Sequence, residues 1–172
     1  MNDRANSAGF SFVELVIAIA LLGIISVTVS ARWFSTDSFQ ADSLKSQLIA
    51  EARLAQRTAL ANSQLEISLV ISEVGDEWRY QTFENDGSGR VLLREASTDS
   101  NNVTIQVIAG STQMLSTGVS LDISYDGLGN VGDFSIGGVA DDASNGVLLL
   151  LMGGSHQLCI SPLGYVHDGS CV

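Results

Sequence analysis

The feature that most constrains this chain is an uncharged apolar run near its N-terminus, preceded directly by one carboxylate. Residues 15–31 contain no charged side chain, and Glu14 stands just before them. At the helical rise this run spans roughly 25 Å, which is just adequate for a tilted helix to cross a bilayer. A lone acid in such a segment is costly and usually has a partner. We therefore expect a membrane-inserted helix whose glutamate pairs with another group.

A cleaved secretory signal is the main alternative for this segment. Its leader is only weakly positive, because Asp3 offsets Arg4, and no small-x-small cleavage site follows the run. The run leads into Arg32 and Trp33 instead, and a signal peptide would gain nothing from Glu14. An anchor that stays in the protein is the better interpretation.

Beyond the apolar run the pattern predicts that the helix continues. Apolar residues recur at intervals of three and four, at Leu44, Leu48, Ala52, Ala55 and Ala59. The chain has one proline, Pro162, so nothing before it forces a break. We expect one helix from about Phe10 to Ala61, apolar all round at first and amphipathic afterwards, with Trp33 at the membrane exit.

After residue 62 the pattern changes to short β-rich runs separated by Gly, Asn, Asp and Ser turns. These runs cover residues 65–74, 77–83, 91–93, 103–108, 119–125, 134–136, 147–152 and 158–160. Seven or eight strands are predicted, forming antiparallel sheet against the exposed half of the helix. Residues 148–152 are continuously apolar, which predicts a strand buried on both faces.

The charge is lopsided. The net charge is −11, and no lysine or arginine follows Arg94, although two histidines, His156 and His167, do. An acidic surface of this kind repels phosphate backbones, so we expect no nucleic-acid binding by the C-terminal half.

The N-terminal residues resemble a known family. The sequence Gly9-Phe10-Ser11-Phe12-Val13-Glu14-Leu15 is similar to the prepilin peptidase motif of type IV pilins and type II secretion pseudopilins. The resemblance implies cleavage between Gly9 and Phe10 on the cytoplasmic face and N-methylation of Phe10. It also implies that Glu14 neutralises the terminal amine of a neighbouring subunit. The competing interpretation is an ordinary single-pass anchor with a chance glutamate.

The family also implies a fold and an organisation. The fold would be α+β and type IV pilin-like, with a long N-terminal α-helix packed on a C-terminal antiparallel β-rich head. Residues 1–9 would be the leader, 10–62 the helix with a membrane span at about 12–31, and 63–172 the periplasmic or extracellular domain. Ala31 stands near where many relatives carry proline, which puts a kink there in doubt.

Two later stretches resemble particular groups within this family. Residues 121–130 resemble a block of the GspH/FimT-like pseudopilin domain, and residues 158–171 resemble the end of MSHA-type minor pilins of the MshC kind. They imply a minor pilin of an MSHA-like pilus in the bacterial inner membrane, and later in the filament. Its partners would be other pilins, the prepilin peptidase and the assembly platform. The alternatives are a minor pseudopilin (H-type) of type II secretion, a DNA-binding minor pilin for DNA uptake and, remotely, a membrane-tethered enzyme.

Two cysteines lie near the C-terminus, Cys159 and Cys171. Outside the cytosol they are expected to form a disulfide. Together with His156 and His167 they could instead form a four-ligand zinc set, so this alternative stays open beside the favoured disulfide.

Other motifs carry weaker signals. Residues 127–132 satisfy G-x-G-x-x-G, but a strand-like run follows them where a dinucleotide site needs a helix, so a hairpin turn is predicted. Oxygen-rich loops at 85–89 and 141–145 could hold calcium, although solvated turns are favoured. No recognisable catalytic triad is present, and we expect neither a cofactor nor enzymatic activity.

Overall fold

The computed structural model describes residues 11–33, 36–100, 103–151 and 156–171. The chain divides into two units at residues 36 and 37. The first unit contains the helix α1 (Phe12–Trp33), and the second contains α2 (Thr36–Ala61) and all of the strands. The predicted continuous helix is thus described as two helices, and residues 34–35 between them lie outside the described part.

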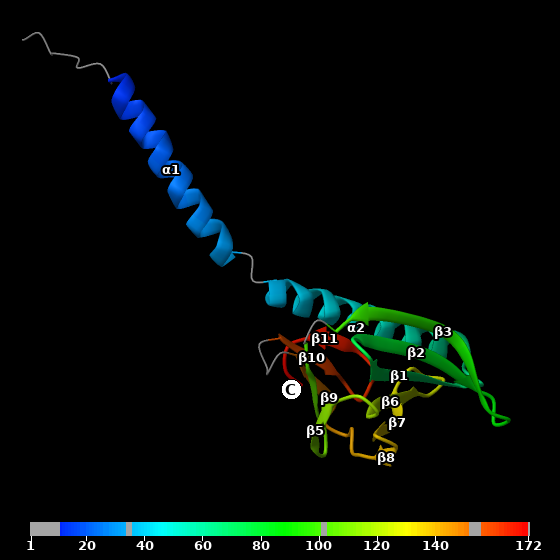
Figure 1. Cartoon of the computed structure of the whole chain (residues 1–172). Coiled ribbons are helices and arrows are strands. Elements are labelled where there is room, and N and C mark those ends of the chain that lie inside the picture. Colours follow the sequence, from blue (N-terminus) through cyan, green and yellow to red (C-terminus); the bar gives the residue numbers. More distant parts are fainter. Residues whose placement is uncertain (1–10, 34–35, 101–102, 152–155, 172) are drawn as a thin grey trace, which may run out of the picture. The chain divides into compact units, whose positions relative to one another are not determined.

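The strands form two antiparallel sheets (Figure 1). The larger sheet has the order β3-β2-β1-β6-β7-β8 and the smaller has the order β11-β10-β9-β4-β5. The strands are β1 (Glu66–Val74), β2 (Glu77–Asn85), β3 (Arg90–Asp99), β4 (Ile105–Ile108), β5 (Thr112–Leu115), β6 (Ser120–Tyr125), β7 (Val131–Ile136), β8 (Val139–Ala140), β9 (Val147–Leu151), β10 (His156–Ile160) and β11 (Val166–Asp168). The α+β pilin-like fold class is confirmed.

The predicted number of strands was too low. The described residues contain eleven strands, because β5, β8 and β11 were not expected. Each has two to four residues, too few for an alternating pattern to stand out in the sequence. The eight expected runs all contain a strand.

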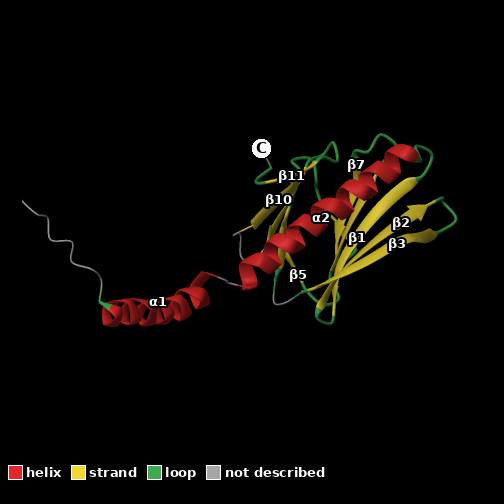
Figure 2. Ribbon diagram, turned by 90° about the horizontal axis from the view of Figure 1, so that it is seen from above, coloured by secondary structure: helices red, strands yellow, loops and turns green. Residues whose placement is uncertain are grey.

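Helix α2 packs on the sheets through the predicted stripe. Figure 2 shows this helix crossing the strands. The five predicted core residues, Leu44, Leu48, Ala52, Ala55 and Ala59, are each at most 1% exposed. The stripe belongs to one hydrophobic core that includes residues from both sheets.

The prediction for residues 148–152 was partly wrong for residues 148–151, and Met152 lies outside the described residues. In β9, Val147, Leu149 and Leu151 are buried, whereas Leu148 and Leu150 are only half-buried. The strand therefore alternates, with one face in the core and the other partly covered. Its apolar residues hide this alternation in the sequence.

Candidate assembly site and C-terminal clamp

The N-terminal motif reaches the described residues at Ser11. Gly9 and Phe10 lie outside them, so the predicted cleavage site has no structural description here. The amide of Leu15 donates a hydrogen bond to the Ser11 carbonyl, 3.2 Å away, which opens α1. Glu14 lies in the first helical turn and is exposed to solvent. Its negative charge is favourable there, because the positive end of the helix dipole lies at the N-terminus.

The described N-terminal part of α1 exposes apolar side chains all round. Exposed fractions are 81% for Phe12, 63% for Val13 and 58% for Ile19, and other large apolar residues of this helix are also exposed. A helix that is apolar on every side is stable only where something covers it. Among the described residues, no helix combines the length and the apolar character needed to cross a membrane.

On one side, α2 is held by the C-terminal segment. The Lys45 ammonium lies 2.9 Å from an Asp168 carboxylate oxygen, and the Arg53 guanidinium donates to the Val166 carbonyl at 3.0 Å. The hydrogen bond from Lys45 lowers the pKa of Asp168, and the same contact raises the pKa of Lys45. One turn further along, the Gln56 amide donates to the Leu163 carbonyl at 3.1 Å. These contacts fix β11 and the turn before it along the helix.

On the other side, α2 is held by β3. The guanidinium of Arg94 donates two hydrogen bonds, of 3.0 and 3.1 Å, to the carboxylate of Glu51. The Glu51 side chain is only 7% exposed, whereas that of Arg94 is 52% exposed. A second contact joins Thr98 to Gln47. A buried carboxylate needs such a partner, so this ion pair fixes the edge of the larger sheet on α2.

The buried position of Glu51 was not predicted from the sequence. The signal was present, because Glu51 lies one helical turn after Leu48 and beside Ala52, within the apolar stripe of α2. A carboxylate in a core stripe predicts a buried ion pair. Its partner on a distant strand could not be chosen from the sequence.

The C-terminal cysteines form the favoured disulfide. Cys159 in β10 is bonded to Cys171. His156 instead places its Nδ1 3.1 Å from Asp42 on α2, and the ring of His167 lies near the carbonyl of Ser170. Within the described residues no group of His, Cys, Asp or Glu side chains is arranged to hold a metal. The disulfide uses both thiols that the zinc set would need, so the zinc set is wrong.

The glycine-rich motif forms a hairpin turn, as predicted. It joins β6 to β7, which pair antiparallel. Asp126 closes the turn by accepting from the backbone amides of Leu128 and Asn130 at 2.9 Å. Burial raises the pKa of Asp126, but these hydrogen bonds outweigh it and the pKa is lowered. Gln56 of α2 also donates to the Gly129 carbonyl at 3.1 Å.

The carboxylates of the two oxygen-rich loops accept hydrogen bonds from other residues of the second unit. Asp86 accepts from the Ser88 amide at 2.8 Å, and Asp141 accepts from the amide and hydroxyl of Ser111. The hydroxyl of Ser111 and the amide of Asp142 lower the pKa of Asp141. The contact of Asp86 is typical of a self-contained turn, whereas Asp141 joins its loop to the turn between β4 and β5.

Comparison with known proteins adds one finding on the N-terminus. Residues 4–30 match the family model described as the prokaryotic N-terminal methylation motif. The chain carries a type IV prepilin-like N-terminus. A search of curated proteins finds no match, and a search of solved structures finds none either.

The methylation motif indicates how proteins of this kind are processed and where they are found. Proteins with this N-terminus are processed by a prepilin peptidase and assemble with pilins. The motif implies an inner-membrane prepilin that later enters a pilus, and such proteins are generally structural subunits. The match ends before α2, so it says nothing of the β-rich head.

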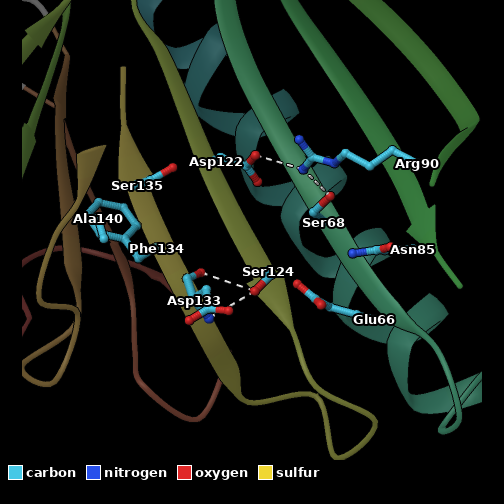
Figure 3. A pocket seen from close by; sticks show the side chains of 10 residues that line it. All are labelled: Glu66, Ser68, Asn85, Arg90, Asp122, Ser124, Asp133, Phe134, Ser135 and Ala140. Atoms are coloured by element: carbon cyan, nitrogen blue, oxygen red, sulfur yellow. Dashed lines mark hydrogen bonds and ion pairs between the residues drawn. The ribbon is translucent and has the colours of Figure 1, made fainter. Parts of the chain in front are cut away.

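The head of this prepilin-like chain has a polar hollow of about 330 Å³ on the larger sheet (Figure 3). Arg90 donates to the Ser68 hydroxyl at 2.5 Å and to Asp122 at 2.7 Å. Two further carboxylates, Glu66 and Asp133, line the hollow. Three carboxylates against one guanidinium make it acidic, which is unsuited to phosphate.

The hollow also contains two buried serines. The Ser124 hydroxyl donates to the backbone carbonyl of Asp133 and accepts from its amide, and Ser68 accepts from Arg90. Neither serine therefore hydrogen-bonds a side chain that could act as its general base.

Proposed function

We propose that the protein is a minor pilin subunit of a type IV pilus, most similar to MSHA-type minor pilins of the MshC kind. It is made as a prepilin, cut between Gly9 and Phe10 and N-methylated at Phe10. Its mature N-terminal helix then packs with those of other subunits. The observation that carries this proposal is the methylation motif at residues 4–30, which leads into an apolar helix with Glu14 in its first turn.

The role of Glu14 follows from its charge and place. Cleavage after Gly9 creates an α-amino group on Phe10, close in sequence to the carboxylate. In a low-dielectric bundle of helices an ammonium and a carboxylate attract strongly, and each is costly without a partner. Glu14 therefore pairs with the terminal amine of a neighbouring subunit and sets the axial position of the incoming helix.

The proposed place before assembly is the inner membrane, with the N-terminus in the cytoplasm and the head in the periplasm. This placement rests on the motif and on the uncharged run of residues 15–31. The disulfide between Cys159 and Cys171 supports an oxidising compartment for the head.

The acidic head supports a structural role over DNA uptake. The net charge is −11, and the hollow on the larger sheet has more carboxylates than bases. The same surface gives no sign of a nucleophile with its base. The alternative is a minor pseudopilin (H-type) of type II secretion, because such proteins have the same N-terminal motif. Genes for a full secretion set beside this one would favour that alternative.

Substitution of Glu14 tests the assembly role. Glu14→Gln keeps the size of the side chain and removes its charge, so the protein still inserts and is cleaved but does not enter filaments. Glu14→Asp is the matched control, because it keeps the charge on a shorter side chain and retains part of the incorporation. Sheared filament fractions and membrane fractions are compared by immunoblot. Normal incorporation of Glu14→Gln refutes the pairing.

A further inference from the structure

Strand β3 has an open edge. It is the outermost strand of the larger sheet, and no described strand pairs with its outer side. Figure 2 shows it at the border of that sheet. It has ten residues, whereas the other outermost strands, β8, β11 and β5, have two to four. A long edge of this kind presents unpaired amides and carbonyls to another strand.

The edge is also apolar at one end. Val91, Leu92 and Leu93 are consecutive, and their exposed fractions are 55%, 47% and 44%. Consecutive residues of a strand point to opposite faces, so apolar surface is exposed on both sides of the sheet here. Apolar surface on both sides of an open edge favours a partner that extends the sheet.

The charges of β3 indicate which partner. Its bases, Arg90 and Arg94, lie in the first half, and its acids, Glu95 and Asp99, lie in the second half. The strand is therefore neutral in a chain of net charge −11. Two copies of β3 side by side and antiparallel bring the basic half of each against the acidic half of the other. We infer that β3 pairs with β3 of a second copy of this chain, joining the two larger sheets across a two-fold axis.

The register follows from full overlap and from the bulge in β3. The pairing with β2 skips Leu93, which is the extra residue of the bulge. If the two copies of β3 pair over their whole length and Leu93 is left out of the register, Arg90 lies opposite Asp99 of the second copy. Leu92 then lies opposite Ser97 of the second copy. The two-fold axis makes each of these pairs occur twice. Arg90 meets Ser68 and Asp122 of its own copy through Nη2, and its side chain is 44% exposed, so its guanidinium can also face Asp99 of the second copy. Opposite charges across a strand pair are favourable, so full overlap and the pair of Arg90 with Asp99 select the same register.

The axis passes through Glu95, where two like charges meet. That carboxylate is already engaged within its own copy. It accepts from the Gln81 amide at 2.6 Å and lies 3.8 Å from the Arg79 guanidinium on β2. The central repulsion is reduced because each Glu95 is drawn toward β2.

The edge is also held in place before it binds. Arg94 is bonded to Glu51, so β3 is fixed on α2 at the centre of the proposed contact. A strand that is already ordered loses less conformational freedom when it pairs.

Cysteine crosslinking of the full chain in detergent micelles tests the register. Opposite residues of paired strands lie about 5 Å apart, which is within reach of a disulfide. Glu95→Cys on the axis is expected to give a covalent dimer under mild oxidation. The control, Gln113→Cys on the edge strand β5, stays monomeric. Equal crosslinking of both variants, or none at position 95, overturns the inference.

Sedimentation of the same full-length protein tests the energetics. Asp99→Lys places like charge opposite Arg90 and is expected to weaken the dimer at least tenfold, and Leu92→Lys abolishes it. The control Met114→Lys, on an equally exposed residue of β5, leaves the dimer intact. Thermal unfolding checks that each variant folds. If Leu92→Lys does not fold, Asp99→Lys decides the result, and a dimer of unchanged affinity overturns the inference.

Discussion

Gly164 is expected to be among the most sensitive positions of the clamp between α2 and the C-terminal segment. Its φ is +77°, and a Cβ built there lies 2.0 Å from the Gly129 carbonyl oxygen and 2.7 Å from the Gln56 amide nitrogen. Gly164→Ala therefore requires the left-handed conformation of alanine and also forces two loops apart. The left-handed conformation costs about 1–2 kcal/mol.

The displacement adds to this cost. Gln56 donates to the carbonyls of Gly129 and Leu163, and both hydrogen bonds are lost when the loops separate. At about 1 kcal/mol for each hydrogen bond, Gly164→Ala lowers the free energy of unfolding by about 3–4 kcal/mol in total.

Gly138 provides the matched control. Its φ is +79°, and a Cβ built there meets nothing within 4 Å. Gly138→Ala is therefore expected to cost only the conformational part, about 1–2 kcal/mol. Urea unfolding of the full chain in micelles, followed by the fluorescence of the buried Trp78, measures both variants. Equal destabilisation by the two substitutions refutes the close contact at Gly164.

Two further predictions concern the same end of the head. Replacement of Cys159 and Cys171 by serine opens a loop with a sequence separation of 12 and lowers the free energy of unfolding by about 3 kcal/mol. Thermal unfolding measures this loss, and an unchanged midpoint contradicts it. The pKa of Asp168 is lowered in the folded protein, so its contribution is present above its ordinary pKa near 3.8 and is lost as the pH falls through the folded value. Wild type is therefore more stable than Asp168→Asn at pH 6, and the gap closes below about pH 4. A constant gap over a urea series in pH refutes this linkage.

The helix and the long strands could be predicted because their patterns are local. The apolar stripe of α2 consists of five positions spaced three or four residues apart between Leu44 and Ala59, and all five side chains are buried. Strand β2 alternates between buried and less buried residues from Trp78 to Phe83, and β1 buries its apolar residues Ile67, Leu69 and Ile71, with Ser68 buried as well. In each case the order of apolar and polar residues indicates which face of the helix or strand is buried.

The polar contacts that hold α2 could not be predicted, because they join segments that are distant in the sequence. Glu51 and Arg94 are 43 residues apart, and Lys45 and Asp168 are 123 apart. Nothing in the local sequence around Arg94 distinguishes it from other exposed bases. The division into two sheets was also missed, since the turns between strands do not determine which strands pair.

The N-terminal motif, in contrast, lies within one short stretch of sequence. Gly9, Phe10 and Glu14 were selected from a short motif, and residues 4–30 match a family model for that motif. A motif read by a processing enzyme acts as an extended sequence, so it can be identified without the fold.

The mass of the mature N-terminal peptide tests the central proposal most directly. The full chain is purified from membranes of its host and digested, and the N-terminal peptide is sequenced by mass spectrometry. The predicted peptide begins at Phe10 and carries one methyl group on its α-amine. An N-terminus at Met1, or at any residue other than Phe10, contradicts the proposal.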